Sequence, residues 1–246
     1  MIFTRNPPCI WIHVYRTAGT SISSWLPQAK EFQIEFARLP HCSASHTEVL
    51  VGESAFRSAW KWAIVRHPWD WLASQFELLN GHPNHWFSSK MREMAFHEFA
   101  FSYPTIYSEH YGYRTQSDFI RMPDGGMGVD FLLPYERISE LWPWLCYRVG
   151  ISEDRAKVEL PRLNISRKRQ EWQSCFSVFS QDEMAALEKL YERDWDLYRK
   201  ALQSTENMTG NIFPPFRKSV LTDTAVVAPL EPHMRRSIGY FIRGQS

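Results

Sequence analysis

Short apolar runs that end at a polar turn and pass into a helix-like segment recur along the chain. The first run, Cys9–Val14, is nearly continuous and rich in β-branched residues, as in a strand buried on both faces of a parallel sheet. Residues 22–26 then carry apolar side chains at i, i+3 and i+4, the spacing of an amphipathic helix. The same succession returns at residues 62–65, followed by a helix that begins at Pro68. This alternation predicts an α/β fold around a central, mostly parallel sheet.

Similar patterns place the remaining elements. They predict further strands at residues 32–36, near the sheet edge, and 129–133, and further helices at residues 47–56, 138–149 and 181–202. We expect residues 1–204 to form one α/β domain. Residues 205–246 contain four prolines and are expected to form an irregular tail that wraps this domain.

The composition excludes several classes of protein. The chain has 246 residues, enough for one sizeable core, and its 28 Lys and Arg balance 27 Asp and Glu, so there is no global basic field for nucleic acid. The four cysteines are scattered and form no C-x-x-C pair, which favours reduced thiols over disulfides or a zinc site. No segment approaches membrane-spanning length, and the N-terminus lacks the long apolar region of a signal peptide. We therefore expect a soluble, cytoplasmic protein with no nucleic-acid partner and no membrane span.

The turn after the first predicted strand has the composition of a phosphate or sulfate cradle. At a strand-to-helix turn, backbone N–H groups lack partners and the helix dipole is positive, so anions are attracted. A permanent charge, small residues and hydroxyl donors stand together here, in Arg16, Thr17, Ala18, Gly19, Thr20 and Ser21. The P-loop pattern G-x-x-x-x-G-K-[ST] is not matched, because the lysine is missing. The alternative is an ordinary connection in which Thr17 caps the helix.

A second anion site is predicted after the apolar run at residues 62–65. Arg66 stands at the end of that run, and Ser74 lies about two helical turns further on. Ligands of open parallel sheets bind at the carboxyl ends of the strands, where a guanidinium and a hydroxyl can grip an anionic group. The alternative is that Arg66 pairs with Asp70 and Ser74 lies on an ordinary helix face. Two such sites would suit a ligand with two separated phosphate-like groups.

The two turns also carry a family resemblance. Residues 10–21 (IWIHVYRTAGTS) and 63–76 (AIVRHPWDWLASQF) resemble, in this order, the two nucleotide-binding motifs of the carbohydrate-type sulfotransferases, which use 3′-phosphoadenosine 5′-phosphosulfate (PAPS). A looser likeness covers most of the chain to about Leu202. The chain departs from the family pattern twice. Families of this type usually carry Pro-Lys in place of Tyr15-Arg16, and Gly-Arg-Phe-Glu in place of residues 134–136.

The resemblance implies a P-loop-like three-layer sandwich and the transfer of a sulfuryl group from PAPS to a hydroxyl or amine of an acceptor, such as a carbohydrate. Residues 17–21 would hold the 5′-phosphosulfate, and Arg66 and Ser74 would hold the 3′-phosphate. Arg16, in the place of the family's lysine, would stabilise the departing oxygen electrostatically. It is a poor proton donor, because the pKa of a guanidinium exceeds about 12.

The acceptor needs a general base near pH 7, a role that suits histidine. His41 is the candidate, because it follows the second predicted strand in a segment that resembles the family's histidine-containing loop. His46 and Glu48 are the alternates, and each of the three has an alternative role as a polar loop residue. The resemblance also implies that Ser166 and Arg167 contact the nucleotide; otherwise they belong to a solvated basic loop. No metal is expected, because the protein supplies the cations.

Residues 82–113 form an inserted helical block crowded with aromatic residues and histidines. One interpretation is an acceptor-binding lobe or lid, since such insertions often lie over α/β sites. The other is a helical subdomain held together by aromatic packing. His82 and His85 lack further metal ligands at a suitable spacing, which argues against a metal site.

Two rival functions stay open on the sequence alone. A small-molecule kinase of P-loop-like fold would need a carboxylate for magnesium at a strand end, and Asp130 lies inside its predicted strand. A non-catalytic descendant that binds nucleotide or glycan is the other rival. The arginine at Arg16, where the family has lysine, is the feature that favours it.

Overall fold

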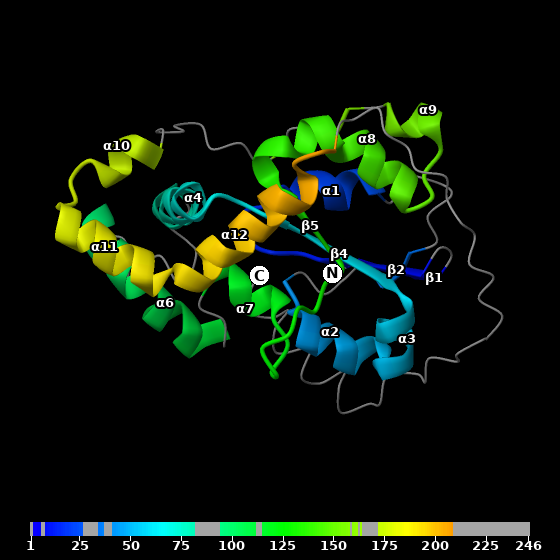
Figure 1. Cartoon of the computed structure of the whole chain (residues 1–246), viewed down its shortest axis with the longest axis horizontal. Coiled ribbons are helices and arrows are strands. Elements are labelled where there is room, and N and C mark those ends of the chain that lie inside the picture. Colours follow the sequence, from blue (N-terminus) through cyan, green and yellow to red (C-terminus); the bar gives the residue numbers. More distant parts are fainter. Residues whose placement is uncertain are drawn as a thin grey trace.

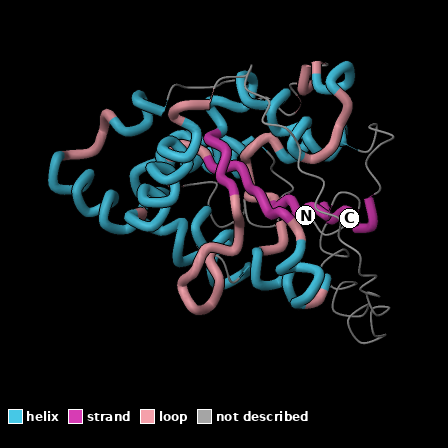
Figure 2. Tube along the Cα trace, turned by 45° about the vertical axis from the view of Figure 1, so that its right-hand side comes forward, coloured by secondary structure: helices cyan, strands magenta, loops and turns pink. Residues whose placement is uncertain are grey.

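The computed structural model describes residues 2–5, 8–26, 34–36, 41–81, 94–111, 115–157, 159–161, 163 and 172–208. At its centre is a five-stranded sheet with the order β3-β1-β2-β4-β5 (Figure 1). Figure 2 shows the strands running through the middle of the molecule with helices around them, which confirms the predicted α/β class. The strands are β1 (Ile2–Arg5), β2 (Pro8–Ile12), β3 (Ile34–Phe36), β4 (Trp60–Val65) and β5 (Phe131–Pro134).

Three strands of the sheet, β2, β4 and β5, pair in parallel, as expected for buried apolar runs. β1 pairs antiparallel with β2 on one side and with β3 on the other. β3 therefore points in the same direction as β2, and β1 alone runs against the other four strands. The edge position predicted for residues 32–36 is confirmed for β3. The sequence pattern does not predict β1, because its four residues are too few for a recognisable alternation.

Helices pack on both faces of the sheet, because successive residues of a strand point to opposite sides. Cys9 and Trp11 of β2 belong to a core shared with the first group of helices, whereas Ile10 and Ile12 belong to a core shared with the second. The first group is α1 (Gly19–Trp25), α8 (Ile138–Arg148) and α9 (Glu153–Ala156). The second group is α2 (Ala44–Val51), α3 (Glu53–Ser58), α7 (Gln116–Ile120) and α12 (Glu192–Thr205).

A third core lies beside the sheet and is rich in aromatic residues. It joins α4 (Pro68–Gly81), α6 (Phe96–Tyr111), α10 (Trp172–Phe176) and α11 (Gln181–Leu190), which gather on the left of Figure 1. Trp71 and Tyr103 meet edge to face at 5.7 Å, and Phe76 and Phe99 at 5.1 Å. The helical prediction for the inserted block is therefore confirmed for α6. Residues 82–93 and 112–113 of the block lie outside the described residues.

Two predicted helices are each divided in the structure. The helix expected at 47–56 is α2 followed by α3, because Gly52 adopts φ +87° between them, a conformation that no helix allows. The helix expected at 181–202 is α11 followed by α12, with Tyr191 in a non-helical conformation at the junction. α12 ends at Thr205, the first residue of the predicted tail, and residues 209–246 lie outside the described residues. Within the described ranges, no helix combines the length and apolarity needed to cross a bilayer.

Candidate functional site

A cavity of about 710 Å³ opens where β2, β4 and β5 end, the edge at which parallel sheets usually bind ligands. Its walls come from the segments that follow these three strands, from His41 and from residues 156, 157, 159–161 and 163. Eight of the residues predicted from the sequence line it: Arg16, Ala18, Gly19, Thr20, Ser21, His41, Arg66 and Ser74. The two turns that the sequence separates by about 50 residues thus share one cavity.

Backbone strain concentrates at this cavity. Arg16 (φ 59°), Ala18 (φ 65°) and His41 (φ 66°) have positive φ, and within the described residues no other non-glycine residue does. All three line the cavity. A positive φ costs an ordinary side chain free energy, and such residues persist where the surroundings hold them, often at binding sites. The residues with strained backbone therefore lie at the same cavity as the two turns predicted from the sequence.

Gly19 is required by a histidine beneath the turn. A Cβ at position 19 would lie 1.5 Å from Nε2 of His13, so the imidazole packs directly against the glycine backbone. The ring of His13 stacks on Trp11 at 4.7 Å and lies 4.2 Å from the ring of His41. His41 in turn stacks on Tyr15 at 3.5 Å. The floor of the turn is therefore a row of aromatic rings.

Burial sets the protonation of this row. It lowers the pKa of His13 well below the ordinary value, and the nearby His41 lowers it further. Burial also lowers the pKa of His41 to about 3. Both imidazoles are therefore neutral at pH 7, and His41 in the ligand-free protein is a weak base.

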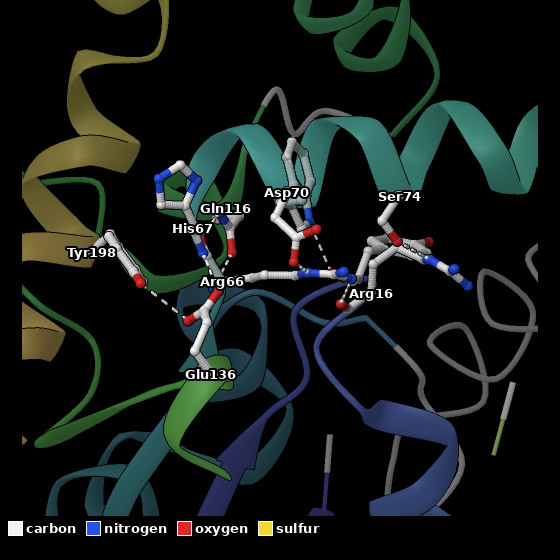
Figure 3. A network of polar contacts seen from close by, with 10 residues as sticks. Arg16, Arg66, His67, Asp70, Ser74, Gln116, Glu136 and Tyr198 are labelled. Carbon is white, nitrogen blue, oxygen red and sulfur yellow. Dashed lines mark hydrogen bonds and ion pairs between the residues drawn. The ribbon is translucent and has the colours of Figure 1, made fainter. Parts of the chain in front are cut away.

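The two arginines are joined through the turns that carry them (Figure 3). The Nε of Arg16 donates to Oγ of Ser74 at 2.8 Å, and Nη1 of Arg66 donates to the carbonyl oxygen of Arg16 at 3.2 Å. Arg66 is 7% exposed and its Nε donates to Oδ2 of Asp70 at 2.5 Å, so the alternative pairing of Arg66 with Asp70 is present. The ring of Tyr135 lies 4.6 Å from the guanidinium of Arg66. Burial, and then the charge of Arg66, lower the pKa of Arg16.

Of the hydroxyl-bearing residues in the first turn, Thr17 bonds within the protein, whereas Thr20 and Ser21 line the cavity. Thr17 is fully buried and its Oγ1 donates to the carbonyl oxygen of Val14 at 2.8 Å, so this hydroxyl braces the turn instead of facing a ligand. The N-cap of α1 is Ala18, so Thr17 does not cap the helix either. Ser21 lines the cavity, and its Oγ accepts a hydrogen bond from the N–H of Leu163 at 3.1 Å. Thr20 is exposed and lines the cavity.

Several residues of the site carry no signal in the sequence pattern. Gln116 grips the backbone of Arg66, accepting from its N–H and donating to its carbonyl oxygen, each at 2.9 Å. Glu136 lines the cavity and accepts from the N–H of His67 at 3.0 Å. Lys157 also lines it. Gln116 and Glu136 stand in segments that resemble the sulfotransferases only loosely, and that likeness was the single hint to either.

The charges around the cavity are mixed. Among the residues that the structure describes, the basic ones in its lining are Arg16, Arg66 and Lys157, and the acidic ones are Asp70, Glu77, Glu136 and Glu159. Asp70 is already paired with Arg66. The cationic part of the wall therefore lies around Arg16 and Arg66, on the two turns.

Of the remaining candidate residues for the base and the nucleotide contacts, two are described and do not reach this cavity. His46 is exposed on α2 and Glu48 is half-buried on the same helix, and neither lines the cavity. Ser166 and Arg167 lie outside the described residues. Among the side chains that the structure describes, no group of three histidines, cysteines or carboxylates is arranged to hold a metal ion.

Comparison of the chain with models of protein families, with curated proteins and with solved structures finds no match.

Proposed function

We propose that the protein is a sulfotransferase that moves a sulfuryl group from PAPS to a hydroxyl or amine of an acceptor, such as a carbohydrate, on a P-loop-like three-layer sandwich. One observation carries the proposal: the turns after β2 and β4, predicted separately as anion sites, line one cavity. There Arg16 is bonded to Ser74, and Arg66 to the backbone of Arg16.

The cavity suits a nucleotide of this kind in size and charge. Its volume of about 710 Å³ falls within the range of roughly 300–1,000 Å³ that is usual for small-ligand sites. Guanidinium groups bind phosphate and sulfate through paired hydrogen bonds. In the proposed complex, Arg66 and Ser74 hold the 3′-phosphate, and the turn at residues 17–21 holds the 5′-phosphosulfate, with Thr17 acting through the turn and not through its hydroxyl. The four cysteines, all free thiols, fit the cytoplasm as the location we propose.

The transfer is an in-line displacement at sulfur. The acceptor oxygen or nitrogen forms a bond to sulfur as the bond from sulfur to the bridging oxygen breaks, and the electron pair stays on the 5′-phosphate of adenosine 3′,5′-bisphosphate. Arg16 stabilises the charge that develops on that oxygen. No metal is required in this scheme, because the arginines provide the positive charge.

The acceptor's proton passes to a base, and His41 keeps that role in the proposal because it lines the cavity and is neutral at pH 7. An anionic nucleotide beside it would raise the pKa of His41, because negative charge favours the imidazolium form. His46 and Glu48 do not line the cavity, so they are weaker candidates.

Binding of adenosine 3′,5′-bisphosphate tests the proposal. A ligand present at 100 times its Kd stabilises the folded state by about 2.7 kcal/mol, which thermal unfolding detects. We expect Arg16→Gln and Arg66→Gln to raise the Kd at least tenfold in calorimetric titrations. Arg57→Gln is the matched control, because Arg57 pairs with Glu53 on the exposed surface of α3. Absence of binding at millimolar bisphosphate would refute the proposal.

Two further measurements separate the rival functions. Tighter binding of ATP with Mg²⁺ than of the bisphosphate would indicate a kinase. Release of label from radiolabelled PAPS, in the presence of a panel of acceptors, distinguishes an enzyme from a non-catalytic binding protein. Arg16→Lys is the informative variant here, because it restores the family's residue and should raise turnover.

A further inference from the structure

Helix α12 reaches the turn after β4 by two separate chains of hydrogen bonds. In the first, Asp194 of α12, which is 1% exposed, accepts from the N–H of Gln116 at 3.1 Å and from the N–H of Ser117 at 2.8 Å. The side chain of Gln116 then hydrogen-bonds to both backbone groups of Arg66: it accepts from the N–H and donates to the carbonyl oxygen. The backbone of Arg66 is therefore held by a residue that α12 holds in turn.

The second chain reaches the next residue of the turn. The hydroxyl of Tyr198, one helical turn after Asp194 on α12, donates to Oε2 of Glu136 at 3.2 Å. The other carboxylate oxygen, Oε1, accepts from the N–H of His67 at 3.0 Å. Figure 3 shows the two chains arriving at the Arg66–His67 turn, Gln116 near the ribbon of α4 and Tyr198 with Glu136 on the other side.

The aromatic surroundings of His67 strengthen the second chain. Its ring stacks on Trp172 at 4.6 Å and meets Trp195 of α12 edge to face at 4.9 Å. Tyr198 contacts the same ring at 5.4 Å. α12 thus contributes two rings that contact the turn directly and two side chains, Asp194 and Tyr198, that hold it through Gln116 and Glu136, more than 120 residues later in the chain.

We propose that α12 acts as a brace that sets the position of Arg66, with Asp194, Gln116, Glu136 and Tyr198 as positioning residues for the anion that Arg66 binds. The identity of that anion rests on the proposed function, but the brace itself does not. Arg66 is useful to a ligand only if its backbone is fixed, because a small shift of the turn moves the guanidinium away from both Asp70 and the cavity. Both backbone groups of Arg66 are occupied by one side chain, so losing that side chain frees the turn.

Removal of single hydroxyls gives the sharpest test. Tyr198→Phe deletes the bond to Glu136, whereas the control Tyr191→Phe deletes a more deeply buried phenol bond away from the turn, from the hydroxyl of Tyr191 to the carbonyl oxygen of Ala100 at 3.0 Å. We expect Tyr198→Phe to raise the Kd of adenosine 3′,5′-bisphosphate three- to tenfold and Gln116→Met to raise it more than tenfold. Tyr191→Phe should lower the melting temperature and leave the Kd within twofold of wild type.

A double-mutant cycle separates positioning from general damage. In an Arg66→Gln background, Tyr198→Phe and Gln116→Met should change the Kd no further, because they act through Arg66. Effects that persist undiminished in that background would overturn the inference.

Amide hydrogen exchange tests the brace without any ligand. The N–H of Arg66 should exchange at least tenfold faster in Gln116→Met, and the N–H of His67 at least tenfold faster in Tyr198→Phe, with both unchanged in Tyr191→Phe. If the wild-type protein does not bind the bisphosphate, the proposed function is wrong. The exchange rates still test whether α12 fixes the backbone of Arg66 and His67. Unaltered exchange in both variants would overturn the proposed brace.

Discussion

Gly19 and His13 show, at the scale of single residues, how a turn motif depends on what lies beneath it. The motif needs a small residue at position 19 because the ring of His13 occupies the space of a side chain there. The sequence alone shows only that small residues stand in a turn that suits an anion. The structure adds the reason for the glycine at position 19, which is the packing of a buried imidazole.

Gly19→Ala should therefore damage both the fold and the site. Inserting a methyl group into a filled space costs about 1–3 kcal/mol of unfolding free energy, and here the obstacle is a rigid ring. We expect that loss in urea denaturation, together with loss of the thermal shift caused by the bisphosphate. Gly81→Ala is the control, because nothing lies within 4 Å of the Cβ it would introduce. Wild-type stability of Gly19→Ala would show that the His13 ring can move aside.

The buried histidines predict a dependence of stability on pH. Burial lowers the pKa of His41 to about 3 in the folded protein, whereas its unfolded value is near 6.5. A lowered pKa means that the unfolded chain binds the proton first, so the stabilisation is present above pH 6.5 and is lost as the pH falls from 6.5 towards 3. Each such histidine adds a slope of up to about 1.4 kcal/mol per pH unit.

His41→Asn tests this dependence, because asparagine does not titrate there and tolerates the positive φ of position 41. We expect the unfolding free energy of the variant to fall less steeply than that of wild type between pH 6 and pH 4.5, measured by urea denaturation. Parallel curves for the two proteins would mean that His41 is already protonated or exposed in the folded state.

At the scale of elements, hydrophobic periodicity located most helices and strands but not their interruptions. α2 and α3 divide at Gly52 and α11 and α12 divide at Tyr191, since one backbone conformation breaks a helix without altering the apolar pattern around it. The aromatic block illustrates a different limit. The sequence predicted an inserted helical segment here, but only the packing shows that the aromatic rings of α6 belong to a core with α4, α10 and α11, and none of the α6 side chains that the structure describes lines the cavity.

Substitutions of Phe99 test whether α6 has a structural role or a binding role. Phe99→Ala empties a fully buried position and should lower the unfolding free energy by about 3–5 kcal/mol. Phe99→Leu is milder and keeps enough folded protein for titration. Both should leave the Kd of the bisphosphate within twofold of wild type. A tenfold rise in Kd for folded Phe99→Leu would assign α6 to the binding site.

At the scale of the whole molecule, strand order brings the site together. β2 and β4 are neighbours in the sheet, although β3 and three helices (α1, α2 and α3) separate them in the chain. Arg16 and Arg66 therefore reach one cavity from positions 50 residues apart. α12 packs near the same turn. Its residue Asp194 accepts a hydrogen bond from the amide of Gln116, which lies 78 residues earlier in the chain.

The sequence by itself determined the α/β class, the apolar strands and the two strand ends that carry arginines, because periodicity and strand-end chemistry are local properties of the chain. Only the tertiary structure decided what each polar group contacts. Thr17 turned towards the carbonyl oxygen of Val14, Arg66 paired with Asp70, and Gln116 became the anchor of Arg66. Hydrogen-bond partners depend on strand order and helix docking, which no local pattern of residues encodes.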